Sequence, residues 1–98
     1  MLDLKDTPNG KLISSRQLYK ELSTSTNHYS EWVGINITTI GVEGLDYFPG
    51  YKIVLQHMER PDILLSLEFA RSLCYINRTK KALKIRKWLF ECELTTSN

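Results

Sequence analysis

Residues 51–74 read YKIVLQHMERPDILLSLEFARSLC, and their patterning changes from strand-like to helix-like within this one segment. Residues 51–55 and 63–65 are rich in strand-forming side chains and flank a polar stretch that contains Pro61, which predicts a short β-hairpin. Ser66 is a good cap for a helix that follows directly. A hairpin leading into a helix predicts a domain of the α+β class.

Two shorter helical patterns precede the hairpin. Ser14 and Ser15 are suited to cap a first helix that ends near Leu22. The polar residues 23–26 interrupt it and offer a new cap. Residues 29–40 carry apolar side chains at i, i+3 and i+4, which predicts a second helix. Two short helices joined by a few polar residues resemble a helix-turn-helix pair, which on its own is weak evidence for DNA binding.

The last predicted helix is apolar on two nearly opposite sides. Thr79 is expected to cap it, and it is expected to end near Leu94. A helix of this kind is either sandwiched within its own domain, between the preceding helix and the hairpin, or turned toward a partner or a second copy. One side comprises Ala82, Ile85, Trp88, Leu89 and Cys92; the other comprises Leu83, Phe90 and Leu94.

The chain length of 98 residues allows one domain. Residues 1–11 contain the turn signal Pro8-Asn9-Gly10 and are expected to form a flexible N-terminal arm. Residues 12 and 13 form an apolar pair that suggests a short edge strand. Residues 12–95 are then expected to be one small α+β domain: a helix-turn-helix-like pair, a short hairpin and two C-terminal helices.

The composition is close to the average for globular proteins, with 42% hydrophobic and 24% charged residues. No apolar run is long enough to cross a bilayer and no secretion signal is visible, which favours a cytoplasmic protein over a membrane or secreted one. Cys74 and Cys92 are therefore expected to be reduced thiols that pack as small hydrophobes. His28 and His57 lie far apart and neither is close to a cysteine, so we expect no metal and no cofactor.

No catalytic pattern is present in the sequence. Nucleophile-elbow, phosphate-loop and dinucleotide-binding glycine patterns are all absent. Glu91 and Glu93 point in different directions on a helix, so they cannot act as a carboxylate pair. We expect a binding protein without a small-molecule substrate rather than an enzyme.

The charge is uneven along the chain. Residues 1–68 carry six basic and nine acidic side chains, a net charge of −3, whereas residues 69–98 carry seven basic and two acidic ones, a net charge of +5. A basic strip of this kind can bind nucleic-acid phosphates or an acidic protein surface, or it can be a solvated helix face. The candidate phosphate contacts are Arg16, Lys20, Arg78, Lys80, Lys81, Lys84 and Lys87.

Several ordered segments resemble phage antirepressors of the AntA/AntB family, which is similar to the KilA-N and BRO-N domains of viruses. The resemblance runs from about Leu12 to Glu93. One difference is Ala82, where family members usually have a glycine before the last helix. The matching segments are SSRQLY (14–19), HYSEW (28–32), GVEGLDY (41–47), LLSLEFARSL (64–73), NRTKKA (77–82) and IRKWLFECE (85–93).

The resemblance implies a phage or prophage regulator in the bacterial host cell, one that binds a phage repressor and favours lytic gene expression. Two alternatives stay open: a DNA-binding transcription regulator that uses the basic segment 78–87, and a phage inhibitor of a host defence or transcription component. The expected partner-binding surface is the second apolar side of the last helix with its neighbouring cations, which gives Leu83, Phe90, Leu94, Lys84 and Lys87 as candidate residues.

Overall fold

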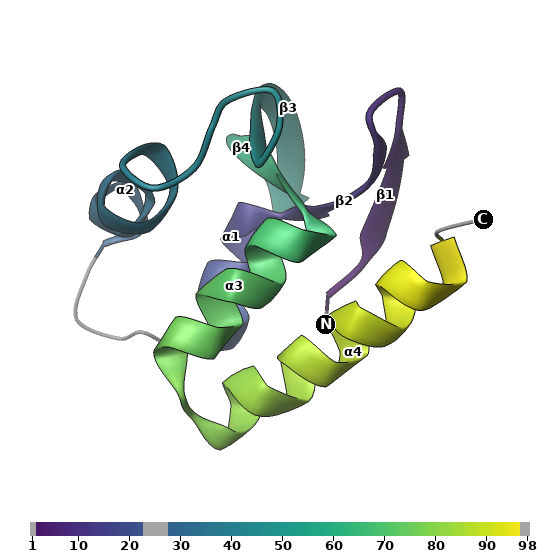
Figure 1. The fold of residues 1–98 in the computed structure, drawn as a ribbon. Coiled ribbons are helices and arrows are strands. Elements are labelled where there is room, and N and C mark those ends of the chain that lie inside the picture. The colour runs from purple at the N-terminus through teal and green to yellow at the C-terminus, as the bar shows by residue number, and fades with distance from the viewer. Residues whose placement is uncertain (1, 23–27, 97–98) are drawn as a thin grey trace.

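The computed structural model describes residues 2–22 and 28–96, and it confirms the α+β class. In these residues a four-stranded antiparallel sheet packs with helices around one core (Figure 1). The strands are β1 (Leu4–Thr7), β2 (Gly10–Ser14), β3 (Tyr47–Leu55) and β4 (Met58–Ser66), and their order across the sheet is β1-β2-β4-β3. The sheet therefore joins the N-terminus to the central hairpin.

The N-terminal segment is a β-hairpin, so the expectation of a flexible arm over residues 1–11 is wrong for residues 4–11. Leu4 pairs with Ile13, and Thr7 pairs with Gly10 around the predicted turn. Gly10 has a φ of +97°, which a glycine adopts without strain. Because β2 also pairs with β4, Leu12 and Ile13 lie in an inner strand and not at an edge.

The central hairpin, β3–β4, is longer than the sequence suggested. Its turn is only two residues, Gln56 and His57, with φ of 50° and 65°. Two successive positive φ values are those of the tight turn that suits the twist of paired strands. Pro61 lies in the part of β4 that does not pair with β2. The N–H that proline lacks is therefore not missing from any β2–β4 hydrogen bond. The polar stretch is therefore mostly strand.

The first two helices are joined by aromatic packing. Helix α1 is Ser15–Leu22 and α2 is Tyr29–Val33, which continues as a π-helical segment, η1 (Gly34–Thr38). The ring centroid of Tyr19 on α1 lies 5.4 Å from that of Trp32 on α2. The cap expected within residues 23–26 lies outside the described residues, so the helix-turn-helix character of this pair stays a prediction.

The last two helices form an antiparallel pair whose predicted caps are confirmed. Helix α3 is Leu67–Asn77, and the Ser66 hydroxyl accepts a hydrogen bond from the Phe69 amide at 3.1 Å. Helix α4 is Lys80–Thr96, and the Thr79 hydroxyl accepts one from the Ala82 amide at 3.0 Å. These bonds satisfy amides that a helix start leaves without partners.

One side of α4 completes the core. Ala82, Ile85 and Leu89 are buried against side chains of the sheet, α1 and α3. Trp88 lies on this side, beside Ile85, but is 36% exposed. It lies at the margin of the buried arc, where α4 passes Leu2 and Glu21.

Gly41 lies where the chain passes closest to α3. A Cβ atom added there would lie 2.9 Å from Phe69 Cζ and 3.0 Å from the Ile37 carbonyl oxygen. We expect Gly41→Ala to lower the free energy of unfolding by about 1–3 kcal/mol, because the chain must shift to admit the methyl group. Urea unfolding measures this. Gly34→Ala is the control, since a Cβ at Gly34 meets nothing within 4 Å, and equal stability of the two variants would contradict the prediction.

Candidate functional site

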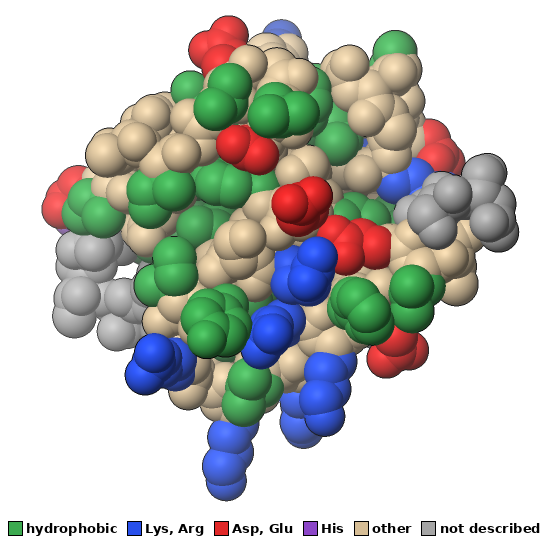
Figure 2. Space-filling view, viewed as in Figure 1, with side chains coloured by type: hydrophobic (Ala, Val, Ile, Leu, Met, Phe, Trp, Pro, Cys, Tyr) green, Lys and Arg blue, Asp and Glu red, His purple; other side chains and the backbone are tan. Residues whose placement is uncertain are grey.

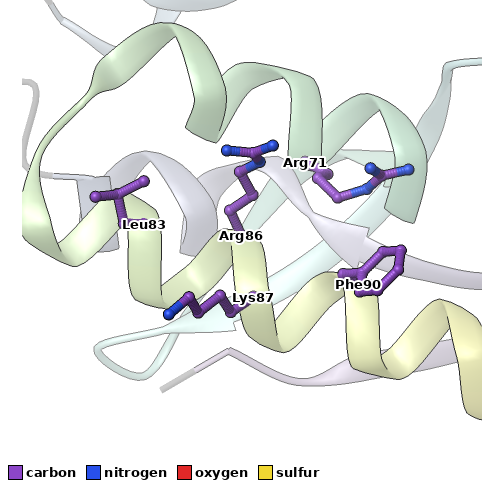
Figure 3. Close-up of a pocket in the computed structure, with 5 residues that line it drawn as sticks. All are labelled: Arg71, Leu83, Arg86, Lys87 and Phe90. Atoms are coloured by element: carbon purple, nitrogen blue, oxygen red, sulfur yellow. The ribbon is translucent and has the colours of Figure 1, made fainter.

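A groove of about 330 Å³ lies between α3 and α4. It is lined by Arg71 from α3 and by Leu83, Arg86, Lys87 and Phe90 from α4, as Figure 3 shows. The helices meet here because the short Arg78-Thr79 connection reverses the chain, with Arg78 in the left-handed conformation that ends α3.

The groove combines exposed apolar side chains with cations. Leu83 and Phe90 are separated by seven positions on α4 and are 47% and 48% exposed. Residues at this spacing lie on one face of a helix, so they form an apolar seam that the described residues leave about half exposed. Lys87 lies between them in sequence and Arg71 lies across the groove on α3. Neither the hairpin nor α3 buries this second apolar side of α4.

Two arginines are held in place beside aromatic rings. The Arg71 guanidinium carbon lies 5.5 Å from the centroid of the Phe90 ring, and that of Arg86 lies 4.7 Å from the centroid of the Tyr75 ring. Arg71 Nε lies 3.1 Å from Glu93 Oε2, an ion-pair distance, but among the described residues no acceptor is aligned with its N–H. Positioned arginines can bind an acidic partner, and at Arg71 that partner would compete with Glu93.

The surface continues from the groove across α3. Tyr75 and Ile76 are both exposed and share a neighbouring hollow with Glu68, Arg71 and Arg86. Figure 2 shows Lys and Arg side chains alternating with hydrophobic ones over the lower part of this face, where α3 and α4 lie in Figure 1.

The structure brings together three of the five predicted partner-binding residues: Leu83, Lys87 and Phe90. Lys84 faces a separate hollow of about 200 Å³ beside Trp88, and Leu94 is exposed beyond the groove. The residues that the sequence analysis missed are Arg71, Arg86 and Tyr75. Arg71 and Tyr75 lie on the preceding helix, and only the packing of the two helices reveals their proximity.

The predicted phosphate contacts do not form one patch. Arg16 on α1 donates from Nε to the Pro61 carbonyl at 2.5 Å, and its guanidinium lies 4.1 Å from the centroid of the Tyr29 ring. Arg16 and Lys20 line a small hollow beside Leu55, not the α3–α4 groove. The remaining candidates, Arg78, Lys80, Lys81, Lys84 and Lys87, follow the α3–α4 turn and α4.

Lys81 is bound within the domain. Its Nζ lies 3.1 Å from Glu21 Oε1, which links α4 to α1. The hydrogen bond from Lys81 lowers the pKa of Glu21, so the carboxylate stays ionised and keeps the pair formed. A phosphate would have to compete with this carboxylate for Lys81.

A buried polar cluster lies under the start of α1. Asp62 Oδ2 accepts a hydrogen bond from the Ser14 hydroxyl at 2.5 Å, and Asp62 Oδ1 accepts one from the Ser15 hydroxyl at 3.3 Å. The Tyr29 hydroxyl lies 2.6 Å from the Ser15 hydroxyl, and burial raises the pKa of Tyr29. Every member has a hydrogen-bonding partner within the domain, so this cluster holds α1 and α2 to β4.

Both cysteines are free, and burial raises the pKa of each thiol, that of Cys74 to about 11. Cys74 lies in the core and Cys92 packs against it, as expected of small apolar side chains. In residues 2–22 and 28–96, no three His, Cys, Asp or Glu side chains are grouped as a metal would require. In the same residues no helix has the length and apolar character to cross a bilayer.

The family model for the AntA/AntB antirepressors matches residues 13–79, more than half of the chain. This chain belongs to the AntA/AntB antirepressor family. The family is regulatory, and membership assigns the chain a phage regulatory, antirepressor role. The match runs from Ile13, near the end of β2, to Thr79, so the AntA/AntB segment includes α3 and one wall of the groove, and α4 supplies the other wall.

The other two comparisons add no relative. No curated protein matches the chain, and no solved structure does. The groove residues of this AntA/AntB chain are therefore interpreted from their geometry alone.

Proposed function

We propose that this antirepressor binds a phage repressor, or another regulatory protein, through the α3–α4 groove, and thereby relieves repression and favours lytic gene expression. The observation that supports the proposal is the exposed apolar pair Leu83 and Phe90 with arginines beside it, on a member of an antirepressor family. Aromatic and Arg side chains are enriched in protein interfaces, where a few residues carry most of the binding energy. A repressor held at this surface would no longer occupy its operator.

The groove also suits a protein chain by its shape. A helix laid along α3 and α4 could insert apolar side chains between Leu83 and Phe90 and leave acidic ones to meet Arg71 and Lys87. Such a contact would bury apolar area at its centre and keep charges at its rim.

Phe90→Glu tests this function against the purified repressor encoded by the same phage. We expect the affinity to fall at least about tenfold, because a carboxylate replaces an apolar anchor at the centre of the interface. Isothermal titration calorimetry gives the affinity, and circular dichroism verifies the fold. Val54→Glu is the matched control, since Val54 is exposed on β3. A folded Phe90→Glu protein that binds the repressor as well as the control does would refute the proposed interface.

DNA binding is the second candidate, because Lys80, Lys84 and Lys87 are all exposed along α4. Under this alternative the chain binds random duplex DNA, and replacing two of these lysines with Ala reduces the salt slope by about two. Under the proposed function, duplex binding stays negligible at about 200 mM salt. Fluorescence anisotropy at two salt concentrations distinguishes the two functions. A host defence or transcription component as target would involve the same groove and is recognised by which purified protein binds.

A further inference from the structure

The two ends of the domain carry opposite charge. Residues 21–51 contain no Lys or Arg and four acidic residues, whereas residues 71–87 contain seven Lys or Arg and no acidic residue. The second segment supplies Arg71, Leu83, Arg86 and Lys87 of the α3–α4 groove, and Glu91 and Glu93 follow it on α4. The first contains α2, η1 and the loop that leads into β3. Opposite charges on separate surfaces of one chain allow two copies to attract each other.

The acidic segment also has its own exposed apolar residues. Ile40 and Val42 are each 56% exposed, and Leu45 is 66% exposed. The turn that presents them is held by several hydrogen bonds, among them Leu45 N to the Val42 carbonyl at 3.1 Å and Val42 N to Asp46 Oδ2 at 2.9 Å. A turn fixed in this way loses little conformational entropy when it binds.

This turn, residues 40–46, and the groove are accessible from the same side of the molecule. In Figure 1 the loop between η1 and β3 runs across the top of the view, and α3 and α4 cross the lower part. Figure 2, in the same orientation, shows most of the Lys and Arg side chains in the lower half, with acidic side chains above them and beside them at the centre. Two copies facing each other about a two-fold axis can therefore place each turn on the other's groove.

We propose that the occupant of the α3–α4 groove in the free protein is a second copy of this chain, with the 40–46 turn of each copy seated on the groove of the other. Val42 and Leu45 meet Leu83 and Phe90, while Glu43 lies near the groove cations. The contact is isologous and closes as a dimer, the commonest symmetry of small assemblies. Charge complementarity selects this pairing, because groove against groove would bring Arg86 and Lys87 of both copies together.

This pairing does not depend on the proposed function, but it bears on it. The second copy and a repressor would compete for one groove, so dissociation of the dimer would precede repressor binding. Repressor affinity would then fall as the concentration of the antirepressor rises, because more of the chain is paired.

Light-scattering mass of the purified protein tests the pairing. We expect roughly twice the 11.4 kDa monomer mass at high micromolar concentration and low salt, and dissociation as salt screens the charges. Leu45→Lys and Phe90→Glu should each give folded monomers, and Val54→Lys, exposed on β3, should remain a dimer. A wild type that is monomeric throughout, or a Leu45→Lys protein that still dimerises, would overturn the pairing.

Mixing the two variants gives the sharpest result. The Leu45→Lys copy keeps an intact groove, and the Phe90→Glu copy keeps an intact turn, so these two surfaces form one native contact. In the other contact the lysine of the first copy meets the glutamate of the second. An equimolar mixture should therefore recover the dimer mass. A mixture that stays monomeric would reject the reciprocal contact.

Repressor binding separates this proposal from the previous one. Leu45→Lys should keep, or improve, its affinity for the repressor, since it frees the groove without changing it. A monomeric wild type that binds its repressor would overturn the pairing alone. A wild-type dimer whose monomeric Leu45→Lys variant binds no repressor would leave the pairing intact and overturn the proposed function.

Discussion

Leu89→Ala is expected to lower the free energy of unfolding by about 3–4 kcal/mol. Leu89 is fully buried in the core, and its removal leaves a cavity that the surrounding helices and sheet fill only in part. For a small domain this loss is a large share of the total stability. The position is informative because α4 lies beyond the residues matched by the family model, although it closes the core.

Chemical denaturation of the wild type and of Leu89→Ala measures this loss of stability. The matched control is Leu83→Ala on the same helix. Leu83 faces the open groove, so its truncation should change the free energy of unfolding by less than about 1 kcal/mol. Equal losses at the two positions would mean that α4 does not bury Leu89 in the core.

Asp62→Ala is expected to lower the free energy of unfolding by about 2–4 kcal/mol, because it leaves buried hydrogen-bond donors without an acceptor. Asp62 is 2% exposed, and the side chains of Ser14 and Ser15, which donate to it, are fully buried. Its carboxylate also accepts from the Arg16 amide at 3.4 Å at the start of α1. The loss therefore reaches both the packing of β4 and the capping of the helix.

Thermal unfolding is a convenient measurement here, since 1 kcal/mol corresponds to a shift of about 4–8 °C in a domain of this size. Asp6→Ala is the control: its carboxylate pairs with Lys11 at 2.7 Å on the surface and should contribute little. The double variant Ser14→Ala, Asp62→Ala should lose less stability than the two single variants lose in sum, because the two side chains share one hydrogen bond. Strict additivity would contradict the direct bond.

Sequence patterns predicted the elements that depend on near neighbours in the chain. Ser66 and Thr79 cap helices because each side chain reaches an amide only three residues away. The two apolar sides of α4 follow from helical periodicity, which places Leu83 and Phe90 together without any knowledge of the fold.

The elements that were missed depend on distant or uncommon contacts. Strand β1 forms because Leu4 pairs with Ile13 of β2. Strand β2 is in turn paired with β4, which lies about 50 residues further along the chain. The β3–β4 turn lacks the Asn-Gly or Asp-Gly that usually marks it, so Gln56 and His57 gave no signal.

Only the part of the candidate site that lies on α4 could be predicted from the sequence, because only that part depends on near neighbours in the chain. Side-chain chemistry and periodicity along α4 determined that an apolar seam with lysines exists, since both are local properties of the chain. Only the tertiary structure decided that α3 brings Arg71 and Tyr75 to that seam, that Lys84 faces a different hollow, and that Lys81 is engaged by Glu21. Those outcomes depend on how the helices pack, and helix packing is set by burial of the whole core rather than by any one segment.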